Sequence, residues 1–440
     1  MRLRTFRGGI HPPGRKEMTA ARPIRVAALP ARVRIPLKQN AGESPIPAVS
    51  TGQRVRTGET IAEASGPVSV PIHASISGTV RAIGPVPVPY GGSAAAIEIE
   101  GDGKDERGWG EGLPDPFAAD PKELLERIRT AGVVGLGGAQ FPAHIKLSPP
   151  PGKRLDCVIV NGAECEPYLT ADHRVMVERA RDVVAGTRVL MRAAGVGKAF
   201  IGIEANKPDA LEAVSAAAAA AGGIEPVALR VKYPQGAEKQ LIAAIIGRSV
   251  PAGALPADVG AVVQNVGTAV AVWEAVSAGK PLFERVVTVS GGGVGEPGNW
   301  LVRIGTPFGD LLAQSGGLSP DTAMLIMGGP MMGVAQGTED VPIVKGTSGI
   351  IALLEGEIAA GRERPCIRCG RCLEVCPMGL SPALIRRAVE KGDWEAAGEL
   401  GVRDCIECGA CVFVCTSGMG QIQGFRRAKL ELSRRGGKRG

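Results

Sequence analysis

Two cysteine-rich stretches read CIRCGRCLEVCP from Cys366 to Pro377 and CIECGACVFVC from Cys405 to Cys415. Each places three cysteines at two-residue intervals and a fourth cysteine three residues later. In ferredoxin loops with this spacing, the first three thiolates bind one [4Fe–4S] cluster and the fourth binds the neighbouring cluster. Eight of the ten cysteines belong to this pattern, which therefore predicts two [4Fe–4S] clusters.

The crossing of the fourth cysteine assigns the ligands. We expect one cluster on Cys366, Cys369, Cys372 and Cys415, and the other on Cys405, Cys408, Cys411 and Cys376. Zinc sites usually pair two CxxC knuckles without a third cysteine at the same spacing. A disulfide framework is disfavoured because the spacings are too tight for good pairing and the chain is expected to be cytoplasmic. Thr416 replaces the usual proline after Cys415, but no ligand is lost.

The segment between the two cysteine stretches predicts helices. Ser381 is a plausible N-cap with Pro382 at the first helical position, and Asp393 could cap a second short helix that runs to Leu400. This region resembles an α-helical ferredoxin module, in which helices rather than a sheet pack around the clusters.

Length and composition indicate a soluble protein of several domains. The chain has 440 residues, of which 44% are hydrophobic and 22% charged. No apolar stretch is long enough to cross a bilayer, and no apolar signal core follows Met1. We therefore expect a cytoplasmic protein that reaches a membrane only through partners.

Most of the net charge of +7 lies in the last residues. From Gly424 to Gly440 seven basic residues stand against Glu431 alone, which leaves about +1 for the rest of the chain. A general nucleic-acid-binding surface is therefore not supported. The basic tail could touch anionic lipid or an acidic partner, but a solvated, frayed end is the favoured interpretation.

The N-terminal region is rich in Gly, Pro and short β-branched runs. Residues 51–63 alternate and turn as β-hairpins do, and with residues 73–80 they resemble a biotinyl/lipoyl-type barrel-sandwich. Carrier domains attach their prosthetic group to a lysine on the connecting hairpin. Here that hairpin, near residues 65–68, offers no lysine, so we expect a docking or structural unit.

A glycine-rich loop follows a helix predicted over residues 122–131. It runs from Gly132 to Lys146 and is not a Rossmann fingerprint, because Gln140 stands where the third glycine is required and no strand precedes it. Such a loop can still present backbone N–H groups to a phosphate, with Lys146 adding charge. A simple turn is the alternative.

The next segments predict an α/β unit with a mostly parallel sheet. A buried strand over residues 155–160 ends in an acidic loop that contains Glu164 and Glu166. Because α/β folds bind ligands where strands end, these carboxylates suit ribose hydroxyls or an oxidised nicotinamide ring, and a solvated loop is the alternative. Strands over 199–204 and 227–232 alternate with an alanine-rich helix from Asp209, and residues 258–264 lead into Asn265.

The remaining features indicate structural roles. Residues 285–309 predict a short β-rich unit that ends in a helix over 310–314, and Gly328–Gly333 predicts a loop. The four histidines lack metal-ligand spacing, and we expect them to be structural: His11, His73, His144 and His173.

Together these segments resemble the RnfC family of peripheral subunits of Rnf electron-transport complexes. The resemblance runs from GGIHPP at residues 8–13 to GFRRAK at residues 424–429, and the middle is similar to the flavin- and NADH-binding subunit of respiratory complex I. It implies that FMN is held by Gly135, Gly137, Gly138, Lys146, Asn161 and Asn265. It also places Glu164 and Glu166 on the nicotinamide side. Gln140 and Ala143 depart from the Gly and Thr usual in that loop.

The resemblance implies a multidomain α/β plus β fold in five parts. These are a barrel-sandwich over 1–117, an FMN/NADH-binding α/β domain over 118–285, a soluble-ligand-binding β-grasp (SLBB) domain over 286–345, a two-cluster helical ferredoxin domain over 346–423 and a basic tail over 424–440.

The implied function is electron transfer between NAD(H), FMN and the two clusters. Hydride would move between NADH and flavin as two electrons, and the clusters would carry them singly. The resemblance implies partners among the integral membrane and ferredoxin-side Rnf subunits, which couple this flow to Na⁺ or H⁺ translocation, and a peripheral position on the cytoplasmic side of the bacterial inner membrane.

Two alternatives remain open from the sequence. One is a soluble relative of the microcompartment cobalamin reductase, which lacks the GGIHPP opening. The other is a cluster-only electron wire without flavin, which Gln140 alone favours.

Overall fold

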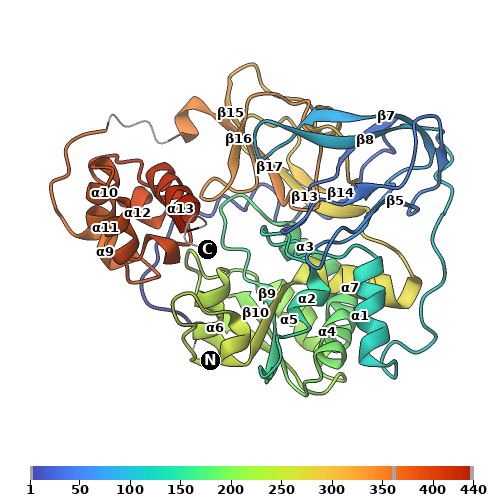
Figure 1. Ribbon diagram of the computed structural model, residues 1–440, viewed down its shortest axis with the longest axis horizontal. Helices are drawn as coiled ribbons and strands as arrows, with labels where there is room; N and C mark the ends of the chain where they lie inside the picture. Colours follow the sequence, from blue (N-terminus) through green and yellow to red (C-terminus); the bar gives the residue numbers. More distant parts are fainter. Residues whose placement is uncertain (1–2, 359–362, 437–440) are drawn as a thin grey trace.

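The computed structural model describes residues 3–358 and 363–436. Figure 1 shows a helical lobe, formed by the C-terminal residues in orange and red, beside a larger body that carries the sheets. Among the described residues, no helix combines the length and the apolar composition that a bilayer crossing requires.

A barrel-sandwich of two small antiparallel sheets forms one end of the body (Figure 1). Its strands are β2 (Arg32–Pro36), β3 (Ile46–Pro47), β4 (Arg54–Val55), β5 (Thr60–Glu63), β6 (Ile72–His73), β7 (Gly78–Pro87) and β8 (Ser93–Gly101). They pair in the orders β2-β8-β7-β4 and β3-β5-β6. Val33 and Ile35 are fully buried, whereas Arg34 between them binds Glu98 on the outer face. This alternation is that of a half-buried strand, and the predicted barrel-sandwich is confirmed.

The predicted parallel sheet is also confirmed. Its strands are β9 (Cys157–Gly162), β10 (Ala199–Glu204), β11 (Ile224–Leu229) and β12 (Ala261–Asn265). Its helices are α1 (Pro121–Thr130), α2 (Ala143–Lys146), α3 (Ala171–Glu178), α4 (Ala180–Ala194), α5 (Pro208–Ala218), α6 (Glu238–Ile246) and α7 (Val266–Ala278), with a 3₁₀ turn η1 (Pro256–Val259). Helices α4, α5 and α7 pack on one face and α6 on the other (Figure 1).

Strand order in this sheet creates a crevice at its carboxyl edge. The order is β11-β10-β9-β12, and all neighbours are parallel. The chain therefore leaves β9 in one direction, toward β10, and returns on its other side as β12. Such a switch point is where open α/β sheets bind ligands. Asn161 and Asn265 are register partners there, at the ends of β9 and β12.

A six-stranded sheet forms the third unit, in the order β1-β14-β13-β17-β15-β16. Its elements are β1 (Ile24–Val26), β13 (Glu284–Ser290), β14 (Gly298–Arg303), α8 (Phe308–Gln314), β15 (Thr322–Met327), β16 (Val334–Gln336), β17 (Gly349–Leu354) and the turn η2 (Glu355–Glu357). Strand β1 comes from the N-terminal segment, and β17 lies beyond the predicted limit at residue 345. The domain limits stay predictions, but this sheet draws on residues outside 286–345.

The first residues cross between units before the barrel-sandwich begins. Arg4 bridges to Leu229, Ile10 bridges to Tyr233, and the N–H of Gly9 donates to Val375 O at 2.8 Å. Gly9 lies at φ +83°, and a Cβ there would stand 2.7 Å from Tyr233 O. The glycine in this motif is therefore required by close backbone approach.

The C-terminal lobe contains α9 (Arg371–Val375), α10 (Pro382–Glu390), α11 (Trp394–Glu399), the turn η3 (Val402–Asp404), α12 (Ala410–Phe413) and α13 (Ile422–Gly436). Asp393 caps α11 as predicted, because its carboxylate accepts from Ala396 N at 3.0 Å. Ser381 occupies the N-cap position of α10, but its side chain makes no capping bond.

The prediction of a frayed tail is wrong for the described part of residues 424–440. Residues 424–436 are part of α13. This helix buries Phe425, Ala428 and Leu432 against α10, α11 and η3. The three apolar side chains recur at the spacing of one helical face, which the surrounding positive charges obscured.

Candidate functional site

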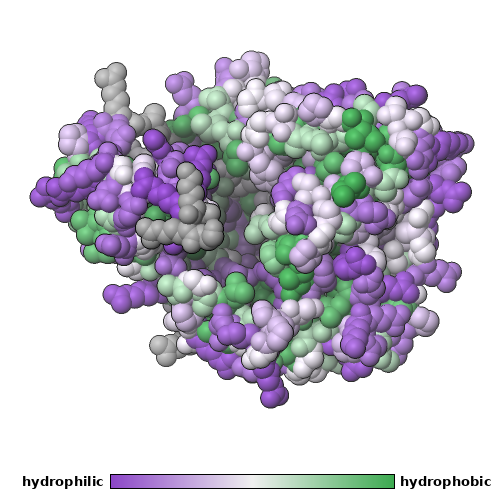
Figure 2. Space-filling model, in the orientation of Figure 1, coloured by the Kyte–Doolittle hydropathy of each residue, from purple (hydrophilic) through white to green (hydrophobic). Residues whose placement is uncertain are grey.

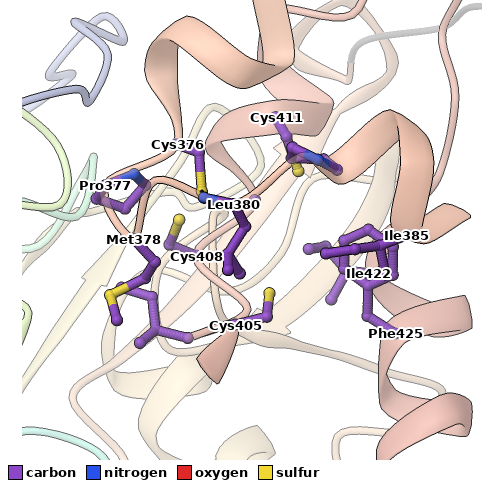
Figure 3. Close-up of a pocket in the computed structure, with 13 residues that line it drawn as sticks. Cys376, Pro377, Met378, Leu380, Ile385, Cys405, Cys408, Cys411, Ile422 and Phe425 are labelled. Atoms are coloured by element: carbon purple, nitrogen blue, oxygen red, sulfur yellow. The ribbon is translucent and has the colours of Figure 1, made fainter. Parts of the chain in front are cut away.

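Four predicted cluster ligands converge inside the lobe. Cys376, Cys405, Cys408 and Cys411 line one pocket, although Cys376 comes from the first cysteine stretch and the others from the second. Figure 3 shows their sulfur atoms turned toward a common space, with Leu380, Ile385, Ile422 and Phe425 around it. The structure thus brings together the four cysteines that the crossing pattern assigns to one cluster, hereafter the inner set.

The walls of this pocket are apolar, and this affects the thiols. Burial raises the pKa of Cys408 to about 11 and that of Cys411 to about 12. A buried thiolate needs a compensating positive charge, which iron supplies when a cluster binds. The donor set therefore fits a thiolate-ligated cluster.

The remaining cysteines lie on an exposed part of the lobe. Cys366 and Cys369 are exposed, whereas Cys372 and Cys415 are partly buried. Cys415 lines an open hollow with Arg371, where α9 and α12 meet. We refer to Cys366, Cys369, Cys372 and Cys415 as the outer set.

The two cysteine loops share one backbone conformation. Arg368 and Glu407, at matched positions, both have φ +57°, and the following glycines Gly370 and Gly409 have φ +80° and +75°. These left-handed backbone conformations, at two matched positions, curve each CxxCxxC loop around the space between its cysteines. This repeated geometry fits two equivalent clusters.

The inner set lies against the body of the molecule. The Tyr233 hydroxyl donates to Cys408 O at 2.8 Å, and Gln240 Nε2 donates to Pro377 O at 3.1 Å. Ile10, Tyr233, Cys408 and Ala410 form a small buried apolar cluster, which Cys165, Met331 and Ile406 extend. This junction joins the lobe to the α/β unit, the N-terminal segment and the six-stranded sheet.

The residues predicted to hold FMN gather at the carboxyl edge of the parallel sheet. Asn161 Nδ2 donates to Gly236 O at 2.8 Å, and Asn265 caps α7 by accepting from Gly267 N at 2.8 Å. A Cβ on Gly137 would stand 3.4 Å from that of Asn265, so the glycine-rich loop passes directly beside it. Lys146 lies at the same edge, bound to Glu238 and to Val263 O. Gly135 continues the loop, and its N–H donates to Phe141 O.

Two features of this edge fit a bound flavin nucleotide. Gly138 adopts φ +129°, and no described atom lies within 4 Å of the position its Cβ would take, so its backbone borders open space. Gln235 is fully buried, yet neither end of its amide finds a partner among the described residues. Unpaired buried amides call for a ligand or ordered water. Sequence reasoning missed Gln235 and Gly236, because no motif marks this loop between β11 and α6.

The two predicted carboxylates are held differently. Glu164 accepts from Asp172 N at 2.7 Å and His173 N at 3.2 Å, at the start of α3. Glu166 accepts from Met331 N at 3.0 Å and Met332 N at 2.9 Å, in the loop after β15. Burial raises the pKa of Glu166 to about 7, although both N–H bonds act in the opposite direction.

Asp172 is a third carboxylate at this edge, and sequence reasoning missed it. Its side chain accepts from Asn265 Nδ2 at 2.6 Å and so fixes the orientation of that amide. Burial and then the nearby Glu164 carboxylate raise the pKa of Asp172 to about 7. The buried Arg285 guanidinium provides the compensating positive charge.

Gln140 does not project toward Asn161 and Asn265. Its side-chain amide donates to the Tyr90 hydroxyl of the barrel-sandwich and lies beside Gly346. Ala143, the other departure from the usual loop, is fully buried at the start of α2. The side chain at 140 therefore joins two units rather than filling the crevice.

The structural role predicted for the four histidines stays a prediction; the backbone N–H of His173 binds Glu164, whereas its ring does not. His173 binds Asp209 at 2.8 Å, and burial lowers the pKa of His73 to about 3. Within the part of the chain that the structure describes, no three His, Cys, Asp or Glu side chains are placed to hold a single metal ion.

Four sequence families match consecutive parts of the chain. They are described as the RnfC barrel sandwich hybrid domain (residues 4–104), the Nuo51 FMN-binding domain (128–274), the SLBB domain (286–335) and the 4Fe-4S dicluster domain (361–416). The cofactors are therefore FMN and two [4Fe–4S] clusters, and the predicted fold class is confirmed.

A solved structure shares the fold. The NAD⁺-reducing [NiFe]-hydrogenase in its air-oxidised state superposes with a TM-score of 0.51 at 20% identity, over 68% of this chain and 61% of that one.

Relatives from three bacteria span nearly the whole chain. A component of the proton-translocating ferredoxin:NAD(+) oxidoreductase complex of Clostridium ljungdahlii is 50% identical over 90% of this chain and 87% of its own length. The corresponding component of the Na(+)-translocating complex of Acetobacterium woodii is 45% identical over 89% and 88%. That of the ion-translocating oxidoreductase complex of Rhodobacter capsulatus is 44% identical over 98% and 84%. The chain belongs to the RnfC family, whose members are subunits of ion-translocating ferredoxin:NAD(+) oxidoreductase complexes.

Proposed function

We propose that this chain carries electrons between NAD(H) at the flavin crevice and redox partners at the membrane, through the inner cluster first and the outer cluster second. This order is supported by the junction between the lobe and the body of the molecule. The inner set is joined to the α/β unit through Tyr233 and Cys408, whereas Cys366 and Cys369 of the outer set are exposed.

The residues at the switch point would hold FMN as follows. The backbone N–H groups of Gly137 and Gly138, with the Lys146 ammonium, would receive the phosphate, and Gly135, whose N–H binds Phe141 O, would shape the loop. Asn161 and Asn265 would position the flavin, with Asp172 orienting the Asn265 amide. Bound FMN supplies the conversion between two-electron exchange with NAD(H) and one-electron exchange with iron–sulfur clusters.

Glu164 and Glu166 would form the nicotinamide side of the site. Glu166 is the better placed to report on electron flow, because the Tyr233 hydroxyl that reaches Cys408 O also lies against its carboxylate. Its raised pKa keeps a substantial fraction of the carboxyl neutral near pH 7, which lowers the cost of its burial. Both roles belong to the proposal.

The names of the relatives support a position beside membrane subunits. The relatives are named as subunits of complexes that translocate protons or Na⁺. We propose that this chain works as the peripheral electron-transfer subunit on the cytoplasmic side of the inner membrane, with the integral membrane and ferredoxin-side subunits as partners.

Cofactor content and NADH-dependent reduction test the proposal. Anaerobically reconstituted chain should contain acid-extractable FMN together with iron and sulfide for two clusters, and NADH should bleach its visible absorbance. Iron and sulfide without flavin, and no bleaching, would instead support the cluster-only wire. Gln140 is the one sequence feature that favours the wire, and its side chain binds Tyr90.

A further inference from the structure

The first part of the outer cysteine loop is exposed. Every residue from Glu363 to Arg371 is exposed, and Ile367, between two ligands of the outer set, is 69% exposed. Phe413, next to the hollow that holds Cys415, is 48% exposed. We define the outer-cluster face as Arg364, Ile367, Arg368, Arg371 and Phe413. Figure 2 shows hydrophobic patches along the outer left edge of an otherwise largely hydrophilic lobe.

The inner loop shows how this type of loop is covered by the body of the molecule. Ile406 occupies in the inner loop the position that Ile367 occupies in the outer loop. Ile406 packs into the junction with Ile10 and Tyr233, where the lobe meets the body. Ile367 is therefore exposed at a position that, in the matched inner loop, is covered by the body of the molecule.

Charge distinguishes the two loops at the matched position. Glu407 of the inner loop is bound by Arg426 at 2.7 Å and Lys429 at 2.6 Å, so its charge is compensated within the lobe. Arg368, its counterpart, is exposed, and Arg364 and Arg371 flank it.

The carboxylates near this loop offset the arginines only in part. Glu363 is bound to Arg386 at 2.7 Å, and Glu374 lies with Arg371 at the hollow beside Cys415. The outer-cluster face therefore combines exposed apolar side chains with an excess of positive charge, which suits an acidic protein surface.

We propose that the outer-cluster face docks an acidic surface on a redox subunit of the same complex, which brings a one-electron centre beside Cys366 and Cys369. The inference rests on the proposed function, because it needs the outer cluster to be the exit of the route. The three arginines would steer and orient the partner, and Ile367 and Phe413 would form the desolvated centre of the contact.

A double variant, Ile367→Ser with Arg368→Glu, tests the proposal without removing a ligand. The chain tolerates glutamate in this backbone conformation, since Glu407 adopts the same φ in the inner loop. The matched control is Val231→Ser with Arg230→Glu, which changes an exposed valine and the exposed arginine next to it, directly after β11 and outside the lobe.

The assay uses membranes that carry the remaining subunits, produced without this chain. Full-length reconstituted chain is added, and both its bound fraction and the NADH-driven reduction of the membrane subunits are measured at increasing salt. The double variant should keep its FMN, its iron and its NADH bleaching, yet bind at least about tenfold more weakly, with a shallower salt dependence. The control should bind like the wild type.

Three results would overturn the docking surface. Binding of the double variant at wild-type strength would show that the outer-cluster face is not the docking surface. Equal weakening of binding by the control variant would show the same. A double variant that behaves normally with membranes but reacts slowly with a soluble acidic ferredoxin would reassign the face to a mobile carrier. If the wild-type chain contains no flavin or is not bleached by NADH, the proposed function is refuted instead. Membrane binding can still be measured in that case, so the docking proposal is tested separately.

Discussion

Replacement of Tyr233 by phenylalanine tests the junction between the lobe and the body. The hydroxyl is buried in a side chain only 1% exposed, and it donates to Cys408 O at 2.8 Å. Phenylalanine keeps the ring and the packing around it but removes the donor. The Cys408 carbonyl would then be left without this bond at a buried position.

The size of the effect follows from the buried carbonyl. Loss of one partner from a buried hydrogen bond costs about 1–3 kcal/mol. If that bond contributes to closure of the junction, the open population of the lobe rises by the corresponding factor, about 5- to 150-fold. The inner loop would be exposed in proportion, whereas the outer loop is already exposed.

Hydrogen–deuterium exchange read by mass spectrometry measures this opening. Backbone N–H groups of α12, next to Cys408, should exchange about 5- to 150-fold faster in Tyr233→Phe, and those of residues 363–371 should not change. Tyr168→Phe is the control, because the Tyr168 hydroxyl binds Glu357 at 2.9 Å, away from the lobe. Unchanged exchange in α12, or an equal rise in the control, would refute the role of the Tyr233–Cys408 bond.

Three further changes address the flavin crevice and the domain contacts. Glu166→Gln should retain FMN but slow reduction by NADH, and undiminished reduction would remove Glu166 from the site. The pKa of Glu166 is about 7 in the folded protein and 4.5 ordinarily, so the wild type should lose up to about 3 kcal/mol of stability as pH rises from 4.5 to 7. Urea midpoints measured across this pH range should show no such loss in Glu166→Gln. Gly137→Ala should fold, since its methyl group would stand 3.4 Å from the Asn265 Cβ. It should bind FMN about tenfold more weakly and keep its iron content unchanged. Full flavin occupancy would contradict the role of Gly137 in holding FMN. The buried Lys345 ammonium donates to Gly132 O at 2.7 Å, and burial lowers its pKa to about 7 from 10.5. The wild type should therefore gain up to about 5 kcal/mol of stability as pH rises from 7 to 10.5, whereas Lys345→Met should show no such gain in the same measurement.

Local sequence patterns predicted the parts of the fold that depend on local chemistry. The strand over 199–204 and the cap at Asp393 are found as predicted, because one depends on a continuous apolar run and the other on a side chain three residues from its partner. The strand predicted over 227–232 instead spans Ile224–Leu229, since pairing with β10 sets its register from Ile224 onward.

Contacts distant in sequence could not be predicted from such patterns. Glu166 binds the N–H groups of Met331 and Met332, and Gly9 binds Val375, so their partners became known only from the fold. The glycines and asparagines of the crevice were found through a family resemblance. Asp172 and Gln235 carry no motif, and burial beside that crevice is what distinguishes them.

The order of the two clusters is the central claim, and one measurement addresses it most directly. Cys369→Ser and Cys408→Ser each remove one predicted ligand, from the outer and the inner set respectively. Each variant is reconstituted anaerobically, mixed with NADH and frozen at successive times for electron paramagnetic resonance. We predict that Cys369→Ser loses one cluster's worth of iron and still reduces its inner cluster at the wild-type rate, whereas Cys408→Ser keeps an outer cluster that NADH no longer reduces. Rapid reduction of the outer cluster in Cys408→Ser, or loss of inner-cluster reduction in Cys369→Ser, would contradict this order.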